Sequence, residues 1–327
     1  MDAQNPPFSV SVSSPPPDES TSAPSMTRAT LPTYGDSSDD ASKLLHFSRH
    51  LNFSGDQTKQ FKEIEGELVS KIRAKDTGYL WFSDITEATF YQLQDGTSRS
   101  TRRLHYFYNF DERKLRVRMP SKAHDSLAVQ LSYLISDKLR SAGLLNTTCV
   151  PNLSPSIRLG NTAAQPDGCW GPLNSEDVTV GIEVGNSESE HELEHDARHW
   201  IGHAESSFQI CLTVKLTKDP DMITLSVWRP QRPQNHIYSG PQLRRRHVFA
   251  AITDRATITR GRPDPVVRFE SLTSPTFTPT EIRLPVAAFT GYQLPPGVYV
   301  NFGDSIVLTG EDLIGFGRLH WILANGY

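Results

Sequence analysis

The sequence predicts a mixed α/β protein in which helices flank a β-sheet, and three observations support this. Between residues 99 and 230, the alternation typical of strands repeatedly gives way to the three- and four-residue apolar spacing of helices. The helical stretches lie between strands, which is typical of a layered α/β core. Beyond residue 230, short apolar runs separated by prolines predict a β-rich C-terminal extension, residues 231–327.

The N-terminal part of the chain predicts two further regions. Residues 1–40 contain nine Ser and seven Pro, so they predict a disordered tail. Residues 41–98 predict a helical segment, because Phe61, Ile64, Leu68 and Ile72 recur at three- and four-residue intervals.

The core, residues 99–230, reads as a hairpin, a helix, three strands, a second helix and two strands. The first helix follows Pro120 and ends near Gly143. The second helix carries an apolar stripe of Leu193, Ala197, Trp200 and Ile201. The strand runs are 104–108 and 115–119 for the hairpin, then 156–159, 165–170, 178–184, 210–216 and 223–228; in the extension they are 248–252, 266–269, 282–284 and 305–308.

Composition excludes several classes of protein. The 327 residues carry a formal net charge of −4, so no overall basic field attracts nucleic acid. The three cysteines lie far apart without CxxC spacing, which excludes a disulfide scaffold and a thiolate zinc finger. The sequence contains no run of about 18 apolar residues, so we expect no membrane span. Residues 1–25 lack the apolar stretch of a signal peptide. We therefore expect an intracellular protein, cytoplasmic or nuclear.

Two acidic residues form the most informative pattern. Asp167 follows Pro166, and Glu183 comes sixteen residues later inside the apolar strand 180–185. A buried acid is costly unless it is paired or bound to metal. On adjacent strands, roughly 5 Å apart, the two carboxylates would suit Mg²⁺. The alternative is that Asp167 forms a turn with Gly168 while Glu183 pairs with an arginine.

Short motifs around these acids occur in a recognisable order. They are Met119-Pro120-Ser121-Lys122-Ala123-His124, Pro166-Asp167, Glu183-Val184-Gly185, and a polar helix running from Asp196 to Trp200. Over about residues 100–230 this order resembles the restriction-endonuclease-like PD-(D/E)xK superfamily, nearest the Uma-type restriction endonucleases and related fungal proteins. The resemblance implies a mixed sheet flanked by helices and a divalent-metal-dependent nuclease. Asp167, Glu183 and the main-chain carbonyl of Val184 would bind Mg²⁺, with His124 beside the site.

The chain departs from that motif at one position. Gly185 stands where the motif has its lysine, and Arg198 or Lys215 would have to supply the missing positive charge. Losing a group that stabilises the transition state costs about 10²–10³ in rate. A second hypothesis is therefore a catalytically inactive member of the fold that acts as an interaction or pathway-accessory protein.

A third hypothesis comes from His191-Glu192-Leu193-Glu194-His195, which has the H-E-x-x-H form of zinc peptidases. His199 and His203 continue the four-residue spacing, so Zn²⁺ is the alternative cofactor. The longer zinc-binding form fails, because Arg198 and Ile201 stand at its glycine and third-histidine positions. A solvated helix face explains the same pattern.

Two basic clusters predict a local nucleic-acid surface. Residues 99–122 hold eight Lys or Arg with aromatic residues between them, and Arg116 and Arg118 should face the same side of one strand. Residues 244–246 are three consecutive arginines. Ordinary solvated surface charge is the alternative.

Overall fold

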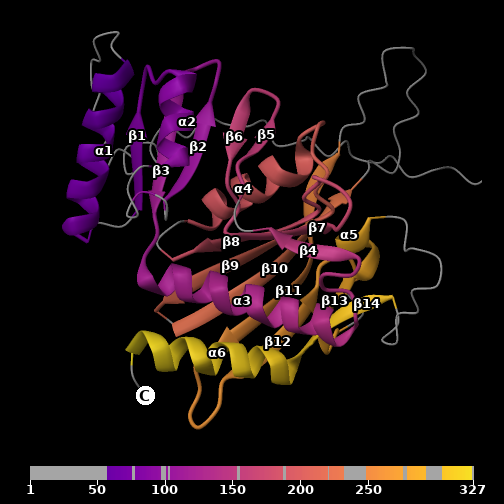
Figure 1. Ribbon diagram of the computed structural model, residues 1–327. Helices are drawn as coiled ribbons and strands as arrows, with labels where there is room; N and C mark the ends of the chain where they lie inside the picture. The colour runs from indigo at the N-terminus through magenta and orange to yellow at the C-terminus, as the bar shows by residue number, and fades with distance from the viewer. Residues whose placement is uncertain are drawn as a thin grey trace, which may run out of the picture. The chain divides into compact units, whose positions relative to one another are not determined.

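Two β-sheets, of five and seven strands, form the framework of the described part of the chain (Figure 1). The computed structural model describes residues 57–75, 78–96, 101, 104–152, 155–186, 189–219, 221–231, 248–274, 278–291 and 304–325. These residues all belong to one unit, residues 47–327. The predicted tail, residues 1–40, and the start of the predicted helical segment lie outside the described residues.

The smaller sheet is built around the predicted hairpin. β2 (His105–Asn109) pairs antiparallel with β3 (Lys114–Met119), which confirms the prediction from the alternating runs. Leu115, Val117 and Met119 form a core with α1 (Gln57–Arg73) and α2 (Glu87–Asp95), so Arg116 and Arg118 project from the opposite face. The strand order is β1-β3-β2-β6-β5, with β1 at Gly78–Phe82, β5 at Ile157–Leu159 and β6 at Thr162–Ala164.

The larger sheet is antiparallel except at its centre, where β8 and β9 run parallel. Parallel neighbours need a crossover connection, and α4 (Glu190–Gly202) supplies it. The strand order is β12-β11-β10-β9-β8-β7-β4. The strands are β4 (Cys149–Asn152), β7 (Gly168–Pro172), β8 (Val180–Gly185), β9 (Ile210–Lys218), β10 (Asp221–Gln231), β11 (Phe249–Thr259) and β12 (Val266–Ser271).

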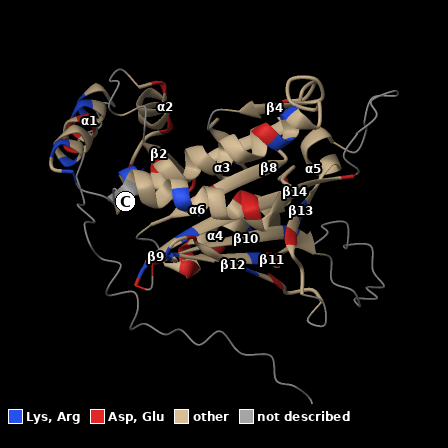
Figure 2. Ribbon diagram, turned by 90° about the horizontal axis from the view of Figure 1, so that it is seen from below, with Lys and Arg blue, Asp and Glu red and all other residues tan. Residues whose placement is uncertain are grey.

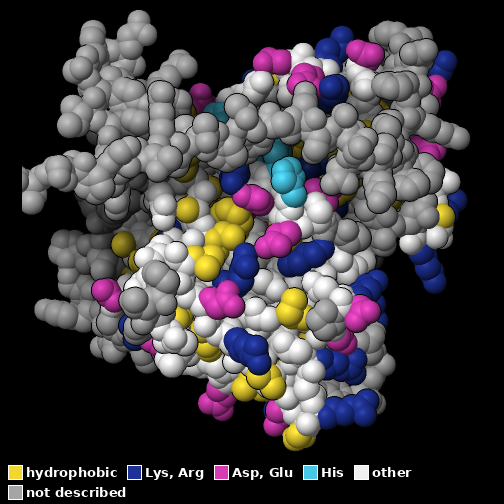
Figure 3. Space-filling view, turned by 180° about the vertical axis from the view of Figure 1, so that it is seen from behind, with side chains coloured by type: hydrophobic (Ala, Val, Ile, Leu, Met, Phe, Trp, Pro, Cys, Tyr) yellow, Lys and Arg dark blue, Asp and Glu magenta, His cyan; other side chains and the backbone are white. Residues whose placement is uncertain are grey.

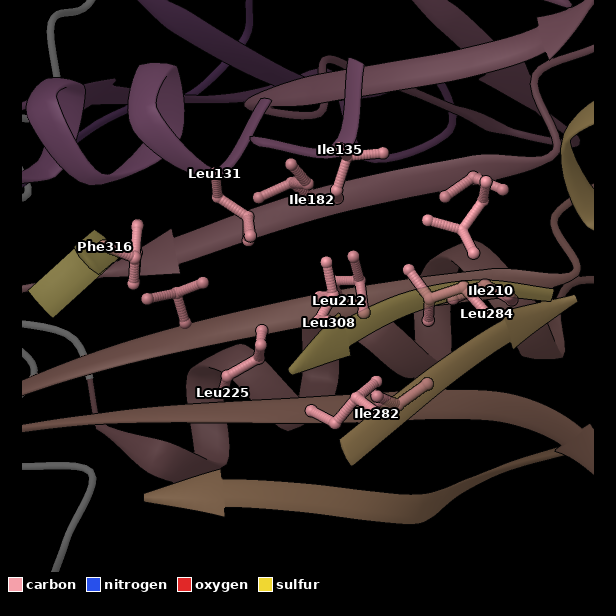
Figure 4. Close-up of a cluster of buried hydrophobic side chains, with 14 of the residues drawn as sticks. Leu131, Ile135, Ile182, Ile210, Leu212, Leu225, Ile282, Leu284, Leu308 and Phe316 are labelled. Carbon is pink, nitrogen blue, oxygen red and sulfur yellow. The ribbon is translucent and has the colours of Figure 1, made fainter. Parts of the chain in front are cut away.

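One face of the larger sheet is covered by α3 (Lys122–Ser141) and α6 (Gly310–Asn325), which lie side by side (Figures 1 and 2). Lys138 of α3 contacts Asp312 of α6 at 2.7 Å, so the end of α3 lies beside the start of α6. The core beneath them also includes residues from β13 (Glu281–Pro285), α5 (Val286–Thr290) and β14 (Ser305–Thr309). Its members include Leu131, Ile135, Ile182, Leu212, Leu225, Ile282, Leu284, Leu308 and Phe316 (Figure 4).

The other face of the larger sheet is covered by α4. Ser189 caps this helix, and the side chain of Glu192 returns a hydrogen bond to the backbone of Ser189, forming a capping box. The predicted apolar stripe of α4 is buried, together with Asp196. Trp200 packs with Cys211 and Trp228 of the larger sheet. Phe107 of the smaller sheet packs against the same cluster, so α4 contacts both sheets.

The structure confirms the mixed α/β class and differs from the predictions in detail. The described residues after position 231 contain four strands at the expected places, and β11 and β12 continue the larger sheet beyond β10. Strand β1 lies inside the segment 41–98 that was predicted to be helical, because its backbone pairs with β3. The short strands β4 and β6 and the long helix α6 were not predicted. None of the helices in the described residues is long and apolar enough to cross a membrane.

Candidate functional site

Asp167 and Glu183 meet at the join between β7 and β8. Asp167 lies just before β7, where its N–H donates to the Ile182 carbonyl at 2.9 Å. Its Oδ2 accepts the Val184 N–H at 2.7 Å, so the carboxylate continues the hydrogen-bonding ladder between the strands. Glu183 lies on the α4 side of β8, because its neighbours Ile182 and Val184 belong to the core under α3. There Trp200 Nε1 donates to Glu183 Oε1 at 2.7 Å.

The guanidinium of Arg118 bridges the two carboxylates. Arg118 comes from β3 of the other sheet, and its Nη2 donates to Asp167 Oδ1 and, at 3.3 Å, to Glu183 Oε2. Its Nη1 lies 3.4 Å from both Glu183 Oε2 and the Val184 carbonyl oxygen. One cationic side chain therefore contacts the three groups that were predicted to bind a metal ion.

Two histidines complete the surroundings of Asp167. His124, in the first turn of α3, places Nε2 3.1 Å from Asp167 Oδ2. His105 of β2 places Nδ1 3.2 Å from Asp167 Oδ1. The predicted neighbour His124 is therefore at the site, and His105 joins it without having been predicted.

The site is closed to solvent. The side chain of Asp167 is fully buried, while that of Glu183 is 4% exposed and that of Arg118 is 6% exposed. The cavity beside them is also lined by Asp196, His199 and Trp200, and measures about 20 Å³. That is room for about one water molecule, far below the 300–1,000 Å³ or so of a typical ligand pocket.

Burial and neighbouring charges shift the pKa values of the two acids in opposite directions. Burial raises the pKa of Asp167, but Arg118, His124 and His105 outweigh it and hold that pKa well below its usual range. Burial, reinforced by the Asp167 carboxylate, raises the pKa of Glu183 to about 8. At neutral pH, Asp167 is thus the ionised member of the pair and Glu183 is mostly protonated.

The two histidines differ in charge for the same reasons. Burial lowers the pKa of His124, but the Asp167 carboxylate and the hydrogen bonds to Asp125 and Asp167 raise it to about 9. Burial lowers the pKa of His105 to about 4 despite the opposing effect of Asp167. His124 is therefore cationic at neutral pH and His105 is neutral.

A second buried ion pair lies beside the first. Arg116 Nη2 is 3.0 Å from Asp196 Oδ1 on α4. The Arg116 guanidinium also lies over three aromatic rings, at 5.0 Å from the ring centroid of Tyr79, 5.9 Å from Trp81 and 4.8 Å from Phe107. Arg116 and Arg118 do face the same side of β3, as expected, and that side is turned toward α4 and β8.

A divalent metal does not fit the residues as they are arranged. Arg118 already fills the contact positions on both carboxylates and on the Val184 carbonyl. Within the described residues, no group of three or more His, Cys, Asp or Glu side chains is placed to hold a metal ion. Binding Mg²⁺ at Asp167 and Glu183 would first require Arg118 to move away, and would add two charges next to the cationic His124.

The two candidate replacements for the motif lysine lie in different places. Lys215 of β9 is in register with Gly185 of β8, so it stands beside the position where the motif has its lysine. Arg198 is half-exposed on α4 and pairs with Glu194, one turn earlier on the same helix. Lys215 is therefore beside Gly185 in the backbone register, and its side chain lines a different cavity from the one that contains Glu183.

The histidines of α4 do not converge. His191 is exposed, and the His195 side chain is 60% exposed with Nδ1 3.5 Å from Asp196 Oδ1. His199 packs edge-on against Phe107, with ring centroids 5.3 Å apart. His203, directly after α4, has its ring centroid 6.4 Å from that of His199. In the part of the chain that the structure describes, no group of three or more His, Cys, Asp or Glu is placed to hold a metal ion, so these four histidines give the zinc-peptidase hypothesis no geometric support.

The predicted basic surface is only partly described. Residues 99, 102, 103 and 244–246 lie outside the described residues. Arg116 and Arg118 are buried in ion pairs, and Lys114 Nζ lies 2.8 Å from Glu112. On the face shown in Figure 3, acidic and basic side chains are mixed. Nucleic acid as a partner remains a prediction.

Arg118 and His105 are the site residues that sequence reasoning missed. The alternation of β3 indicated that Arg118 faces away from Leu115 and Val117. Nothing in the sequence indicated that this face would meet β8, because the contact joins residues 65 positions apart on two different sheets.

Comparisons with known proteins show a distant likeness to solved structures. No family model matches the sequence, and no curated protein is similar to it. Among solved structures, a protein from Anabaena variabilis described as "a putative nuclease belonging to DUF820" is similar, with 13% sequence identity and a TM-score of 0.35. The likeness covers 65% of this chain and 90% of that protein.

Proposed function

We propose that this protein has the restriction-endonuclease-like fold and acts as an interaction or pathway-accessory protein, without metal-dependent hydrolysis. The observation that carries the proposal is the position of Arg118. Its guanidinium contacts Asp167, Glu183 and the Val184 carbonyl, the three groups that a nuclease of this type would use to bind its metal.

The guanidinium of Arg118 balances the charge of Asp167 and hydrogen bonds to Glu183 without providing the chemistry of a metal. It carries a single charge, stays protonated, and offers only N–H donors. A metal ion lowers the pKa of bound water and polarises a phosphoryl oxygen through open coordination positions. With Arg118 in place the acids hold the two sheets together, and the cavity of about 20 Å³ leaves no space for a phosphodiester.

The proposal is tested by metal binding and nuclease activity on the full chain. We expect the wild-type protein to show no Mn²⁺ binding that depends on Asp167, and no plasmid nicking in millimolar Mg²⁺ or Mn²⁺. Arg118→Ser removes the guanidinium and should create Mn²⁺ binding, which the added substitution Asp167→Asn should abolish. The control Arg140→Ser changes an exposed arginine on α3 and should leave Mn²⁺ binding unchanged.

Two results would overturn the proposal. One is Mg²⁺-dependent nicking by the wild-type protein that disappears in Asp167→Asn. The other is a folded Arg118→Ser protein with no gain in Mn²⁺ binding, because Arg118 would then not be what excludes the cation. Circular dichroism of each variant establishes that it is folded.

The register of Lys215 favours a second candidate function, the metal-dependent nuclease. Lys215 stands beside Gly185, so it could provide the charge that the motif normally takes from its own lysine. This candidate requires Arg118 to leave both carboxylates when substrate binds. It predicts wild-type nicking of DNA or RNA that falls by about 10²–10³ in Lys215→Ala. Nicking that is equal in wild type and Lys215→Ala would exclude that role for the lysine.

A further inference from the structure

A larger cavity lies on the other face of the seven-stranded sheet, beneath α3 and α6. Its volume is about 640 Å³, within the roughly 300–1,000 Å³ range of small-molecule sites. It is bounded by the start of α3, the ends of β8 and β9, the start of β10 and the last turns of α6. The end of α6 lies beside the start of α3 in both ribbon views (Figures 1 and 2).

The start of α3 gives this cavity a positive character. An α-helix leaves its first N–H groups without partners in the helix and carries a partial positive charge there. Ser121 caps the N–H of His124, while Lys122 and Ala123, the first two residues of α3, line the cavity. Lys218, at the end of β9, also lines it.

The single acidic side chain among the lining residues is already neutralised. Asp221 Oδ2 lies 3.0 Å from Arg260 Nη1, and Asp221 Oδ1 accepts the Trp321 Nε1–H at 3.0 Å. The lysines at positions 122 and 218 therefore set the charge of the cavity.

His320 supplies an independent indication of a ligand. The residue is 1% exposed and lines the cavity from α6, yet its Nδ1 has no hydrogen-bond partner among the described residues. A buried polar atom without a partner is unfavourable, so a ligand that turns the imidazole toward the cavity and hydrogen bonds to this atom would be stabilising. Leu216 and Leu323 provide apolar walls beside it.

We propose that this cavity binds a phosphorylated small molecule of about mononucleotide size. The phosphate lies at the start of α3 between Lys122 and Lys218, because helix N-termini and ammonium groups both bind phosphate. The organic part lies between Leu216 and Leu323, within hydrogen-bonding distance of His320. The inference does not depend on the role of Arg118, which lies on the other side of β8.

Calorimetry on the full chain at low salt tests the site with two probes, inorganic phosphate and AMP. We expect saturable binding of both, and tighter binding of AMP because its organic part gains apolar contacts. Lys218→Ala should weaken both probes by about tenfold or more, the usual effect of losing a hydrogen bond from a charged group. Ala123→Phe should block AMP by filling the cavity. Lys62→Ala changes an exposed lysine on α1 and should have no effect.

Three results would overturn the proposal. The first is that neither probe binds. The second is that both probes bind the wild type and the folded Lys218→Ala and Ala123→Phe proteins with the same affinity. Equal wild-type affinities for phosphate and AMP would overturn the assignment of an organic ligand. Arg118→Ser should keep AMP binding, so a failure here is distinguishable from a failure of the proposed accessory function.

Discussion

Arg118 provides the closest positive charge to the buried carboxylate of Asp167. Asp167 is ionised inside the protein, and its contacts with Arg118 and His124 keep its pKa well below the usual range against the effect of burial. The guanidinium of Arg118 also donates hydrogen bonds to the Glu183 carboxyl group and the Val184 carbonyl. Removing one partner of a buried ion pair leaves the other charge without compensation.

Arg118→Met should therefore destabilise the protein strongly. Methionine keeps much of the side-chain volume but removes the guanidinium from Asp167 and leaves the cationic His124 as its partner. The expected loss is about 3 kcal/mol of unfolding free energy, at the lower end of the cost of breaking a buried ion pair. Urea denaturation measures it. The matched control is Arg140→Met, whose pair with Asp137 is more than half exposed on both sides and should be worth less than about 1 kcal/mol. Equal losses in the two variants would show that Arg118 does not act through the buried pair.

At the scale of the element, α6 packs closely because of one glycine. A Cβ added at Gly317 would lie 2.8 Å from a ring carbon of Trp321 and 2.9 Å from Ile258 Cγ2. Both of those side chains are fully buried and have no room to move. Gly315, two residues earlier, has open space around the same position.

The two glycines of α6 should respond oppositely to alanine. Gly317→Ala forces α6 away from β11 and should cost about 1–3 kcal/mol, the usual effect of overpacking a core. Gly315→Ala only reduces backbone freedom in a helix and should add about 0.5–1 kcal/mol. Thermal unfolding of the two variants checks the signs. A stabilising Gly317→Ala would mean that α6 does not approach the sheet this closely.

The same helix illustrates where sequence reasoning succeeded and where it stopped. The segments with strong apolar periodicity, such as the stripe of α4 and the strands of β2 and β3, were predicted correctly. Residues 310–325 were not, because three glycines lower the helix propensity. One of them, Gly317, allows a close contact with Ile258 on a strand far away in the chain, which the sequence does not reveal. The same limit applies to the site. Acids at Asp167 and Glu183 were predicted to converge from their own strands, whereas the cation between them comes from another sheet.

For the whole molecule, the buried charges join separate layers. Arg118 connects β3 to Asp167 and Glu183 of the larger sheet, and Arg116 connects the same strand to Asp196 of α4. Proton binding by these groups is therefore coupled to the packing of one layer on another. Conditions that change their charge should change the stability of the whole fold.

The unfolding free energy should fall as the pH rises from about 7 to 9. Relative to ordinary values of 4.5 and 6.5, folding raises the pKa of Glu183 to about 8 and that of His124 to about 9. A group that holds its proton more tightly in the folded state contributes stability below its unfolded pKa and loses it as the pH passes the folded one. His105 and His199, whose pKa values burial lowers to about 4, act in the opposite sense and only below about pH 6.5.

Urea titrations between pH 6.5 and 9 measure the slope of the unfolding free energy against pH. Each proton that the folded state binds in excess of the unfolded state contributes about 1.4 kcal/mol per pH unit to this slope. Glu183→Gln and His124→Asn should each flatten it, because each removes one of the two titrating groups. His191→Asn changes an exposed histidine of α4 and should leave the slope as it is. If all four proteins lose stability equally with pH, the protons are bound elsewhere, and the acids between the two sheets do not hold the charge states inferred from their burial.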